Sequence, residues 1–380
     1  MSYHLNKRIL TSILILFLVI LKSISNIANG EWRTHLSYHN PEKSLAAFGK
    51  IYSLCSGSIY SYDPEDRSIQ TFDKINTLSD SKIVQIAYSA SEKAIILVYD
   101  NGNIDLLYED NDIFNIPDFH ISDLSDKTVN DIYIHNRYAY LSTNFGVIVL
   151  NTYKKEISNS FYLGYSVNSS IIREEKIFCT TTNGIFSGNL SDNLLDFSNW
   201  IKTNPYSFNK IFEFDNKLFA LSNDNKVWFL NSNGSMGSET LITGISSLSL
   251  SQKNLIVIKD SNIIIYNTIN TYNQFSLDNY PVSFVFFDGT YYWISYPDSG
   301  LNGYKIVNNS LKKVVQGVIP NSPKRNYFNY MDFSPDGRLL VVGGSLNYSG
   351  VDYEGTVMIL NDNSWSYFPE NIKEITQLNY

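Results

Sequence analysis

The stretch Val129–Leu150 reads Val-Asn-Asp-Ile-Tyr-Ile-His-Asn-Arg-Tyr-Ala-Tyr-Leu-Ser-Thr-Asn-Phe-Gly-Val-Ile-Val-Leu. Its β-branched and aromatic residues suit a pleated surface and predict three short strands. Asn136-Arg137 and Asn144-Phe145-Gly146 predict the turns between them, because Asn and Gly tolerate a positive φ. A more polar fourth strand follows. The expected strands are residues 129–134, 138–143, 147–150 and 155–161.

The rest of the chain repeats this four-stranded unit. An aromatic or aliphatic residue in the middle of the second strand recurs at intervals of 36 to 48 residues, and in six copies a turn residue follows six positions later. A period of about 40 residues with four strands per unit is typical of a β-propeller. An irregular β-sandwich would not keep that offset. The marker residues are Tyr52, Ile96, Tyr140, Phe178, Phe219, Ile256, Tyr292 and Leu340.

The eighth copy is set apart from the other seven. Residues 319–326 contain two prolines among polar residues, which is the composition of a linker. The sequence therefore predicts an all-β chain with a seven-bladed β-propeller of four-stranded blades over residues 31–318. Residues 327–380 would form the first blade of a probable second, truncated propeller. A single eight-bladed ring is the alternative interpretation.

The N-terminus has the pattern of an export signal. Lys7 and Arg8 precede an apolar run over residues 9–21, and small residues precede Glu31. This predicts a signal peptide over residues 1–30 and export through the Sec pathway. An uncleaved anchor is the alternative, but the run is shorter than the roughly 20 residues of a spanning helix. Residues 32–36 could then form an extra strand that pairs with the last blade and closes the ring.

The net charge limits the class of partner, and the positions of the two cysteines argue against a disulfide. The net charge is −8, and it becomes −11 without the three basic residues of the signal segment. This acidic balance argues against nucleic acid as a partner, because phosphate binding needs a basic surface. Cys55 and Cys179 fall on second strands of the first and fourth repeats, too far apart in a ring for a disulfide. We predict two packed thiols.

No pattern of residues predicts catalysis, a metal or a cofactor. The chain has no nucleophile elbow, phosphate-binding loop or zinc-protease motif. His35 and His39 flank an expected strand and turn, His120 an expected loop, and His135 the end of a strand, so none predicts a ligand set. The acidic groups are interpreted as solvated turns although calcium uses such oxygens. These groups are Asp63, Glu65 and Asp66, and Glu109, Asp110 and Asp112.

The aromatic and basic residues also have simple structural interpretations. Tyr, Phe and Trp are abundant and could bind sugars or proteins, but most fall on strand positions, so Trp228 and Trp293 are expected in the core. The basic pairs are expected on solvated faces. These pairs are Arg173 and Lys176, Lys312 and Lys313, and Lys324 and Arg325. The ligand-binding residues therefore stay unknown at this stage.

Four segments near the N-terminus resemble the start of the PorZ family of the type IX secretion system. They are Glu31–Tyr38, Ile59–Asp63, Lys74–Asp80 and Tyr99–Leu106. The blades, as in Tyr292-Trp293-Ile294 with Gly300-Leu301, are also similar to two-component-regulator propeller repeats. The resemblance covers essentially all of the chain after the signal. It is specific at the N-terminus and generic in the blades.

The resemblance implies two tandem seven-bladed propellers and a C-terminal β-sandwich signal domain, which would make this chain a fragment ending in the second propeller. It implies a non-catalytic scaffold at the cell surface, associated with the outer membrane. The implied partners are a PorU-type sortase, an outer-membrane shuttle protein, a PorQ-type protein and anionic lipopolysaccharide, which the scaffold helps deliver to the sortase.

Two other classes of function remain open from the sequence. A periplasmic ligand-sensing propeller of a hybrid two-component regulator would need a spanning helix and a kinase after the propeller. A propeller enzyme would need paired carboxylates or a cofactor cluster at the central channel.

Overall fold

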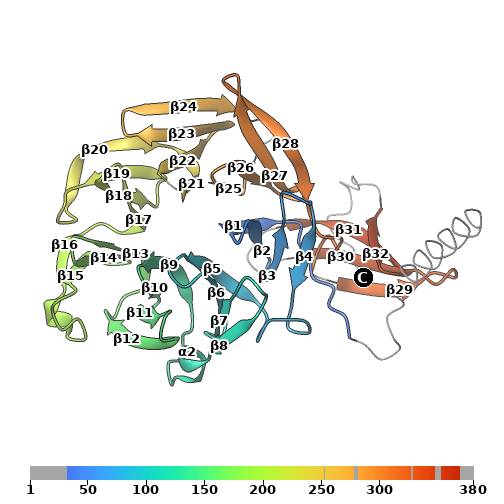
Figure 1. Ribbon diagram of the computed structural model, residues 1–380, viewed down its shortest axis with the longest axis horizontal. Helices are drawn as coiled ribbons and strands as arrows, with labels where there is room; N and C mark the ends of the chain where they lie inside the picture. Colours follow the sequence, from blue (N-terminus) through green and yellow to red (C-terminus); the bar gives the residue numbers. More distant parts are fainter. Residues whose placement is uncertain (1–31, 252, 278–280, 327, 347–351, 369–380) are drawn as a thin grey trace, which may run out of the picture. The chain divides into compact units, whose positions relative to one another are not determined.

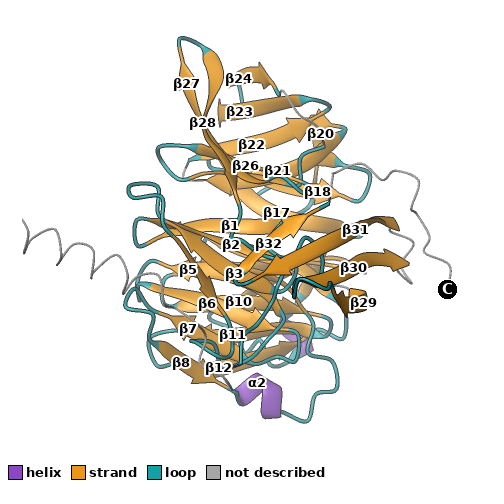
Figure 2. Ribbon diagram, turned by 90° about the vertical axis from the view of Figure 1, so that its right-hand side faces the viewer, coloured by secondary structure: helices purple, strands orange, loops and turns teal. Residues whose placement is uncertain are grey.

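The computed structural model describes residues 32–251, 253–277, 281–326, 328–346 and 352–368, and the predicted signal peptide lies outside them. Eight four-stranded antiparallel sheets follow one another along the chain, and each is built from four consecutive strands. Figure 2 shows that strands make up nearly all of the regular structure. The all-β class and the four-stranded repeat predicted from the sequence are therefore confirmed.

The strands of the first four sheets are β1 (Pro41–Ala47), β2 (Lys50–Cys55), β3 (Ser58–Tyr62), β4 (Ile69–Phe72), β5 (Ile83–Ser89), β6 (Ala94–Tyr99), β7 (Ile104–Leu107), β8 (Ile113–Ile116), β9 (Val129–His135), β10 (Tyr138–Thr143), β11 (Gly146–Asn151), β12 (Glu156–Tyr162), β13 (Val167–Arg173), β14 (Lys176–Thr181), β15 (Gly184–Asn189) and β16 (Ile201–Asn204). The remaining strands are β17 (Phe208–Phe214), β18 (Lys217–Ser222), β19 (Lys226–Leu230), β20 (Met236–Thr243), β21 (Ile245–Ser251), β22 (Asn254–Lys259), β23 (Asn262–Thr268), β24 (Thr271–Ser276), β25 (Phe284–Phe287), β26 (Tyr292–Tyr296), β27 (Gly300–Val307), β28 (Ser310–Val318), β29 (Phe328–Phe333), β30 (Leu339–Leu346), β31 (Asp352–Asn361) and β32 (Ser364–Tyr367).

All eight marker residues lie on the second strand of their sheet, as the repeat predicts. In the third sheet, Tyr140 of β10 pairs with Tyr133 of β9 on one side and with Val149 of β11 on the other. The turn residue Asn136 has a φ of 54°, a conformation that asparagine adopts with less strain than most residues. The quoted stretch therefore folds into the predicted unit because its turn residues fit the backbone between its strands.

The first seven sheets pack face to face in a closed ring (Figure 1). One apolar cluster joins each pair of neighbouring sheets, and another joins the seventh sheet to the first. Successive side chains of a strand point to opposite faces. Tyr52 of β2 therefore packs against the second sheet, whereas Ile51 and Cys55 of the same strand pack against the seventh.

The ring closes without the extra strand expected over residues 32–36, and that expectation is wrong. These residues form no strand, and β1 begins only at Pro41. Side chains instead join the first and seventh sheets. The Tyr60 hydroxyl donates to the Val318 carbonyl at 3.0 Å, and the Ser295 hydroxyl donates to the Pro41 carbonyl at 2.9 Å. Apolar packing around Trp293 completes the seam.

The eighth sheet has its own small apolar cluster, formed by Val341, Met358 and Trp365. Its first strand, β29, is exposed along its whole length, and Phe333 keeps 69% of its surface accessible. Residues 319–326, predicted as a linker, form no strand, but Pro320 and Pro323 within them are buried. The division into two propellers with a boundary at this segment stays a prediction.

Two short helical segments interrupt the strands. They are α2 (Asp118–Ile121), which buries Phe119, and a 3₁₀ turn over Phe197–Asn199 capped by the carboxylate of Asp196. Neither was predicted, because segments of three or four residues carry no periodic signal. None of the helices among the described residues has the length and apolar character needed to cross a bilayer.

Candidate functional site

The first strand of each ring sheet lies nearest the centre of the ring (Figure 1). In six of the seven ring sheets, the second residue of that strand has no partner in the ladder, which marks a β-bulge. A bulge re-aims side chains and is common beside functional sites. The bulged residues are Glu42, Val84, Asn130, Asn168, Asn209 and Ser246.

Side chains at these bulges, or directly after them, bond one first strand to the next. The Lys43 ammonium donates to the Gln85 amide oxygen at 3.0 Å, and the Gln85 amide donates to the Asn130 carbonyl at 2.8 Å. Asn130 and Asn168 each donate to a carbonyl of the following first strand at 2.8 Å. These bonds form a polar arc that runs from the first sheet to the fifth.

Three charged residues take the same position, directly after the bulge, in the first, third and fifth sheets: Lys43, Asp131 and Lys210. The Asp131 carboxylate accepts from the Ser169 hydroxyl at 2.9 Å. Burial lowers the pKa of Lys43; the Asp131 charge opposes that shift and the Lys210 charge adds to it. With Glu42 at the first bulge, these positions carry two cations and two anions, so the arc is polar and charge-balanced.

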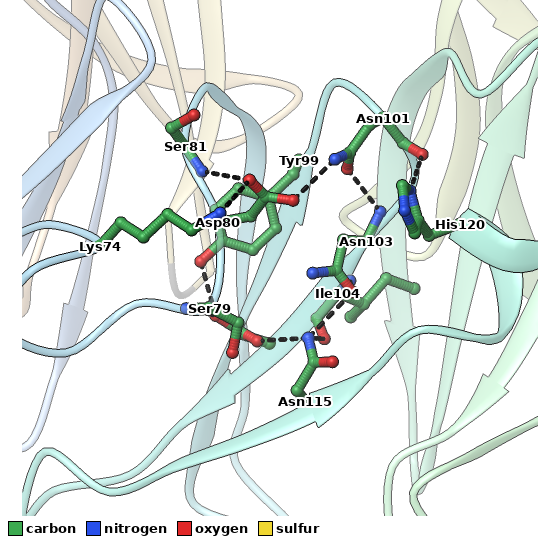
Figure 3. A network of polar contacts seen from close by, with 11 residues as sticks. Lys74, Ser79, Asp80, Ser81, Tyr99, Asn101, Asn103, Ile104, Asn115 and His120 are labelled. Carbon is green, nitrogen blue, oxygen red and sulfur yellow. Dashed lines mark hydrogen bonds and ion pairs between the residues drawn. The ribbon is translucent and has the colours of Figure 1, made fainter.

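A second polar network ties the loop after β4 to the second sheet (Figure 3). Its centre is Asp105 of β7, whose carboxylate is fully buried. It accepts from the Tyr99 hydroxyl at 2.5 Å, from the Asn115 amide at 2.8 Å and from the Ser79 backbone N–H at 3.0 Å. Three donors compensate the desolvated carboxylate, so this network holds the loop in place.

Asp80 is a second, partly buried carboxylate in the same network. Its carboxylate accepts from the Asn101 amide at 2.7 Å, from the Ser81 N–H at 2.9 Å and from the Lys74 ammonium at 3.3 Å (Figure 3). Burial alone would raise the pKa of Asp80, but these hydrogen bonds and the Lys74 charge outweigh it and hold the pKa below its usual value. These bonds hold the loop over residues 73–82 against the second sheet.

A third polar cluster lies between the ring and the eighth sheet. Arg325 donates to both carboxylate oxygens of Asp298, at 2.5 and 2.7 Å. The Tyr367 hydroxyl donates its hydrogen to the Ser322 carbonyl. Its oxygen is therefore the acceptor in the 2.8 Å bond to His39, in which Nε2 donates. This cluster, which we call the junction, connects β32 to the chain before β1.

The predicted fate of the two cysteines is confirmed. Cys55 and Cys179 lie on second strands of the first and fourth sheets, and both thiols are free and buried. Burial raises the pKa of both thiols well above the usual value. Both are therefore poor nucleophiles at neutral pH.

The acidic turns behave as ordinary turns in the structure. The carboxylates of Asp63, Asp66 and Asp110 each accept from a backbone N–H two residues later. The part of the chain that the structure describes holds no group of three or more His, Cys, Asp or Glu side chains arranged for a metal. His120 lies in α2 and not in a loop, and its ring contacts the Asn101 carbonyl at 3.1 Å (Figure 3).

Two expectations about exposed side chains are wrong. Arg325 is buried instead of solvated, because the Asp298 carboxylate compensates its charge. Arg173 contacts Glu213 of the next sheet at 3.4 Å, and only 17% of its side chain is exposed. Trp293 lies fully in the core as expected, whereas Trp228 is only partly buried.

A repeated asparagine in the sequence could have predicted the bulges of the polar arc. Asn130, Asn168 and Asn209 each stand directly after the first residue of an expected first strand. A polar residue at that point of an apolar strand, repeated through successive copies, marks a bulge. The partners of Lys43 could not be found in this way, because they come from the next blade.

Residues 51–201 match the family model of the N-terminal β-propeller domain of PorZ, a TSS9 protein. A search among curated proteins gives no match. The WD40 β-propeller domain of Doa1 has a TM-score of 0.53 at 10% identity, covering 71% of this chain and 92% of that chain, and it shows the propeller fold alone.

The structure of PorZ from Porphyromonas gingivalis, described as an essential bacterial surface component of the type-IX secretion system, is similar with a TM-score of 0.78. The identity is 25%, and the match covers 89% of this chain and 46% of that chain, so this chain spans about half the length of PorZ. Residues 51–201 therefore match the PorZ N-terminal β-propeller family model, and the fold of the chain is similar to that of PorZ, a surface component of the type-IX secretion system.

Proposed function

We propose that this protein is a non-catalytic cell-surface scaffold of the type IX secretion system, which helps deliver anionic lipopolysaccharide to the sortase attachment complex. The observation that carries the proposal is the similarity to PorZ along 89% of this chain. The proposed partners are a PorU-type sortase, an outer-membrane shuttle protein and a PorQ-type protein. Export through the Sec pathway would place the protein at the outer membrane.

The physical properties of the ring support a binding role. Apolar packing between all neighbouring sheets makes a rigid body, and loops on a rigid body are where binding sites commonly lie. The network around Asp105 holds one long loop in a single conformation. Lys43, Asp131 and Lys210 give the centre of the ring both donors and acceptors for a polar ligand.

The experiment is a pull-down from the native cell surface with the tagged gene product, followed by identification of proteins and lipopolysaccharide. We expect the sortase, the shuttle protein and anionic lipopolysaccharide to be recovered together. A strain deleted for the gene should release secreted cargo that is not attached to lipopolysaccharide. Normal attachment in the deleted strain, with none of these partners recovered, would refute the scaffold role.

A further inference from the structure

A recess of about 250 Å³ opens between the outer strands of the fifth and sixth sheets. Ile242 of β20 forms one wall, and β23 and β24 of the next sheet form the other, where these strands lie side by side in Figure 1. Tyr266 of β23 pairs directly with Tyr272 of β24, and Gln274 stands two residues further along β24 on the same face. The recess is therefore built mainly on paired strands, and the turn between β22 and β23 adds Asp260.

The two tyrosines give the recess an aromatic wall. Their ring centroids lie 5.2 Å apart with an angle of 45° between the planes. Tyr266 is only 7% exposed, whereas Tyr272 is 57% exposed and stands at the rim. Tyr266 also belongs to the apolar cluster between the fifth and sixth sheets, so its ring is held in place. Such a rigid aromatic surface needs little ordering when a ligand packs on it.

The polar groups around this wall have no protein partner. Within the described part of the chain, no hydrogen bond or ion pair is made by the hydroxyls of Tyr266 and Tyr272, the Gln274 amide, the Lys259 ammonium or the Asp260 carboxylate. None of these atoms is sealed from solvent either. Tyr266 is the informative case, because a hydroxyl on a ring more than nine-tenths buried normally finds a partner. This one is left for water or a ligand.

We propose that this recess binds one saccharide unit of a surface glycan. A sugar ring has an apolar face that packs on tyrosine and a rim of hydroxyls that both donate and accept hydrogen bonds. The recess offers that combination: aromatic rings, donors on Lys259, an acceptor on Asp260, and an amide that does both. The opposite charges of Lys259 and Asp260 sit on neighbouring positions, which disfavours a highly charged ligand held by charge alone.

The volume limits the ligand to a single unit inside the recess. Sites for drug-sized ligands occupy about 300–1,000 Å³, and this one is slightly smaller. Its open rim at Tyr272 lets a longer chain continue outside. The inference rests on the proposed function only for the source of the glycan, which would be lipopolysaccharide; the recess itself is argued from its side chains.

The test is saturation-transfer NMR on the full chain after signal removal. One arm uses the delipidated polysaccharide of the lipopolysaccharide of the native strain, and the other uses a panel of methyl glycosides. Tyr272→Ala removes the exposed wall and should weaken binding at least about tenfold, whereas Tyr272→Phe should keep most of the affinity. Tyr206→Ala, at another exposed tyrosine outside the recess, is the matched control and should leave binding unchanged. Thermal melts of all three variants check the fold.

Each outcome decides between the two proposals. If no saccharide binds, or if Tyr272→Ala binds as well as the unchanged chain, the recess proposal is overturned. If the polysaccharide still binds to Tyr272→Ala at full strength, the scaffold function survives with its glycan elsewhere. If methyl glycosides bind through Tyr272 but the polysaccharide does not, the recess stands and lipopolysaccharide is not its ligand.

Discussion

Arg325 and Asp298 form a two-pronged ion pair that joins the segment before the eighth sheet to the seventh sheet of the ring. The guanidinium side chain is 9% exposed and the carboxylate side chain 36%. Asp298 also binds the segment before β1, because its backbone N–H donates to the Asn40 side-chain oxygen at 2.7 Å. One residue of the seventh sheet therefore holds both the entry to the ring and the exit from it.

Arg325→Met should destabilise this region by about 2 kcal/mol. Removing one partner of a buried pair costs roughly 3–5 kcal/mol, and the partial exposure of Asp298 reduces that cost. Hydrogen exchange should speed up first in β32 and in residues 319–326. Lys312→Met, on the exposed strand β28, is the control and should change little. Unchanged exchange in β32 would show that the ion pair does not hold the eighth sheet.

His39 should make the junction sensitive to mild acid. Burial lowers the pKa of His39 below its usual 6.5; the Asp298 carboxylate opposes this shift, and the Arg325 and Lys324 charges add to it. The unfolded chain therefore binds a proton near pH 6.5 that the folded chain does not, so stability falls as the pH drops below that value. Urea unfolding at pH 7.5 and 5.5 should show the loss.

His39→Gln isolates this effect, because glutamine keeps a donor for the Tyr367 hydroxyl and does not titrate. The variant should lose less stability than the unchanged chain between the two pH values. An equal loss in both proteins would assign the acid sensitivity to other groups.

Asp105→Ala should destabilise the ring by about 2–4 kcal/mol. The change leaves the Tyr99 hydroxyl, the Asn115 amide and the Ser79 N–H without their buried acceptor. Urea unfolding measures the loss. Asp110→Ala removes an exposed carboxylate that bonds one N–H in a turn, so it should cost much less. Similar values for the two variants would mean that water replaces the lost acceptor in the network of Asp105.

Gly184→Ala should be poorly tolerated. A Cβ at this position would lie 2.1 Å from the Asn204 carbonyl oxygen, and the φ of 111° strains any side chain. The expected cost is at least about 1 kcal/mol, seen as a lower midpoint of thermal unfolding. Gly49→Ala meets no atom within 4 Å and shares only the positive φ, so it serves as the control. If both variants melt at the same temperature, the close approach of the Asn204 carbonyl carries no cost.

The sequence predicts the blades well because each blade is formed by four strands that are consecutive in the chain. Tyr140 and Phe178 identify second strands from their own neighbours, and the turns between strands follow from Asn and Gly within a few residues. Sequence patterns fail where the decisive contact comes from a distant blade. The sequence predicts a solvated Arg325, because its partner Asp298 lies 27 positions earlier and no local pattern links the two. The recess at Tyr272 likewise needs Ile242, which comes from another sheet.

The seam between the first and seventh sheets has a consequence for the time course of folding. Its hydrogen bonds join residues 254 and 258 positions apart, as in the pairs Ser295–Pro41 and Tyr60–Val318. Each ring sheet consists of four consecutive strands, so it can form from its own segment as the chain emerges. Contacts of such long sequence separation form slowly, because a large loop must close first. We therefore expect the ring to close last, so that a newly made chain passes through an open arc of finished blades before the first and seventh sheets meet.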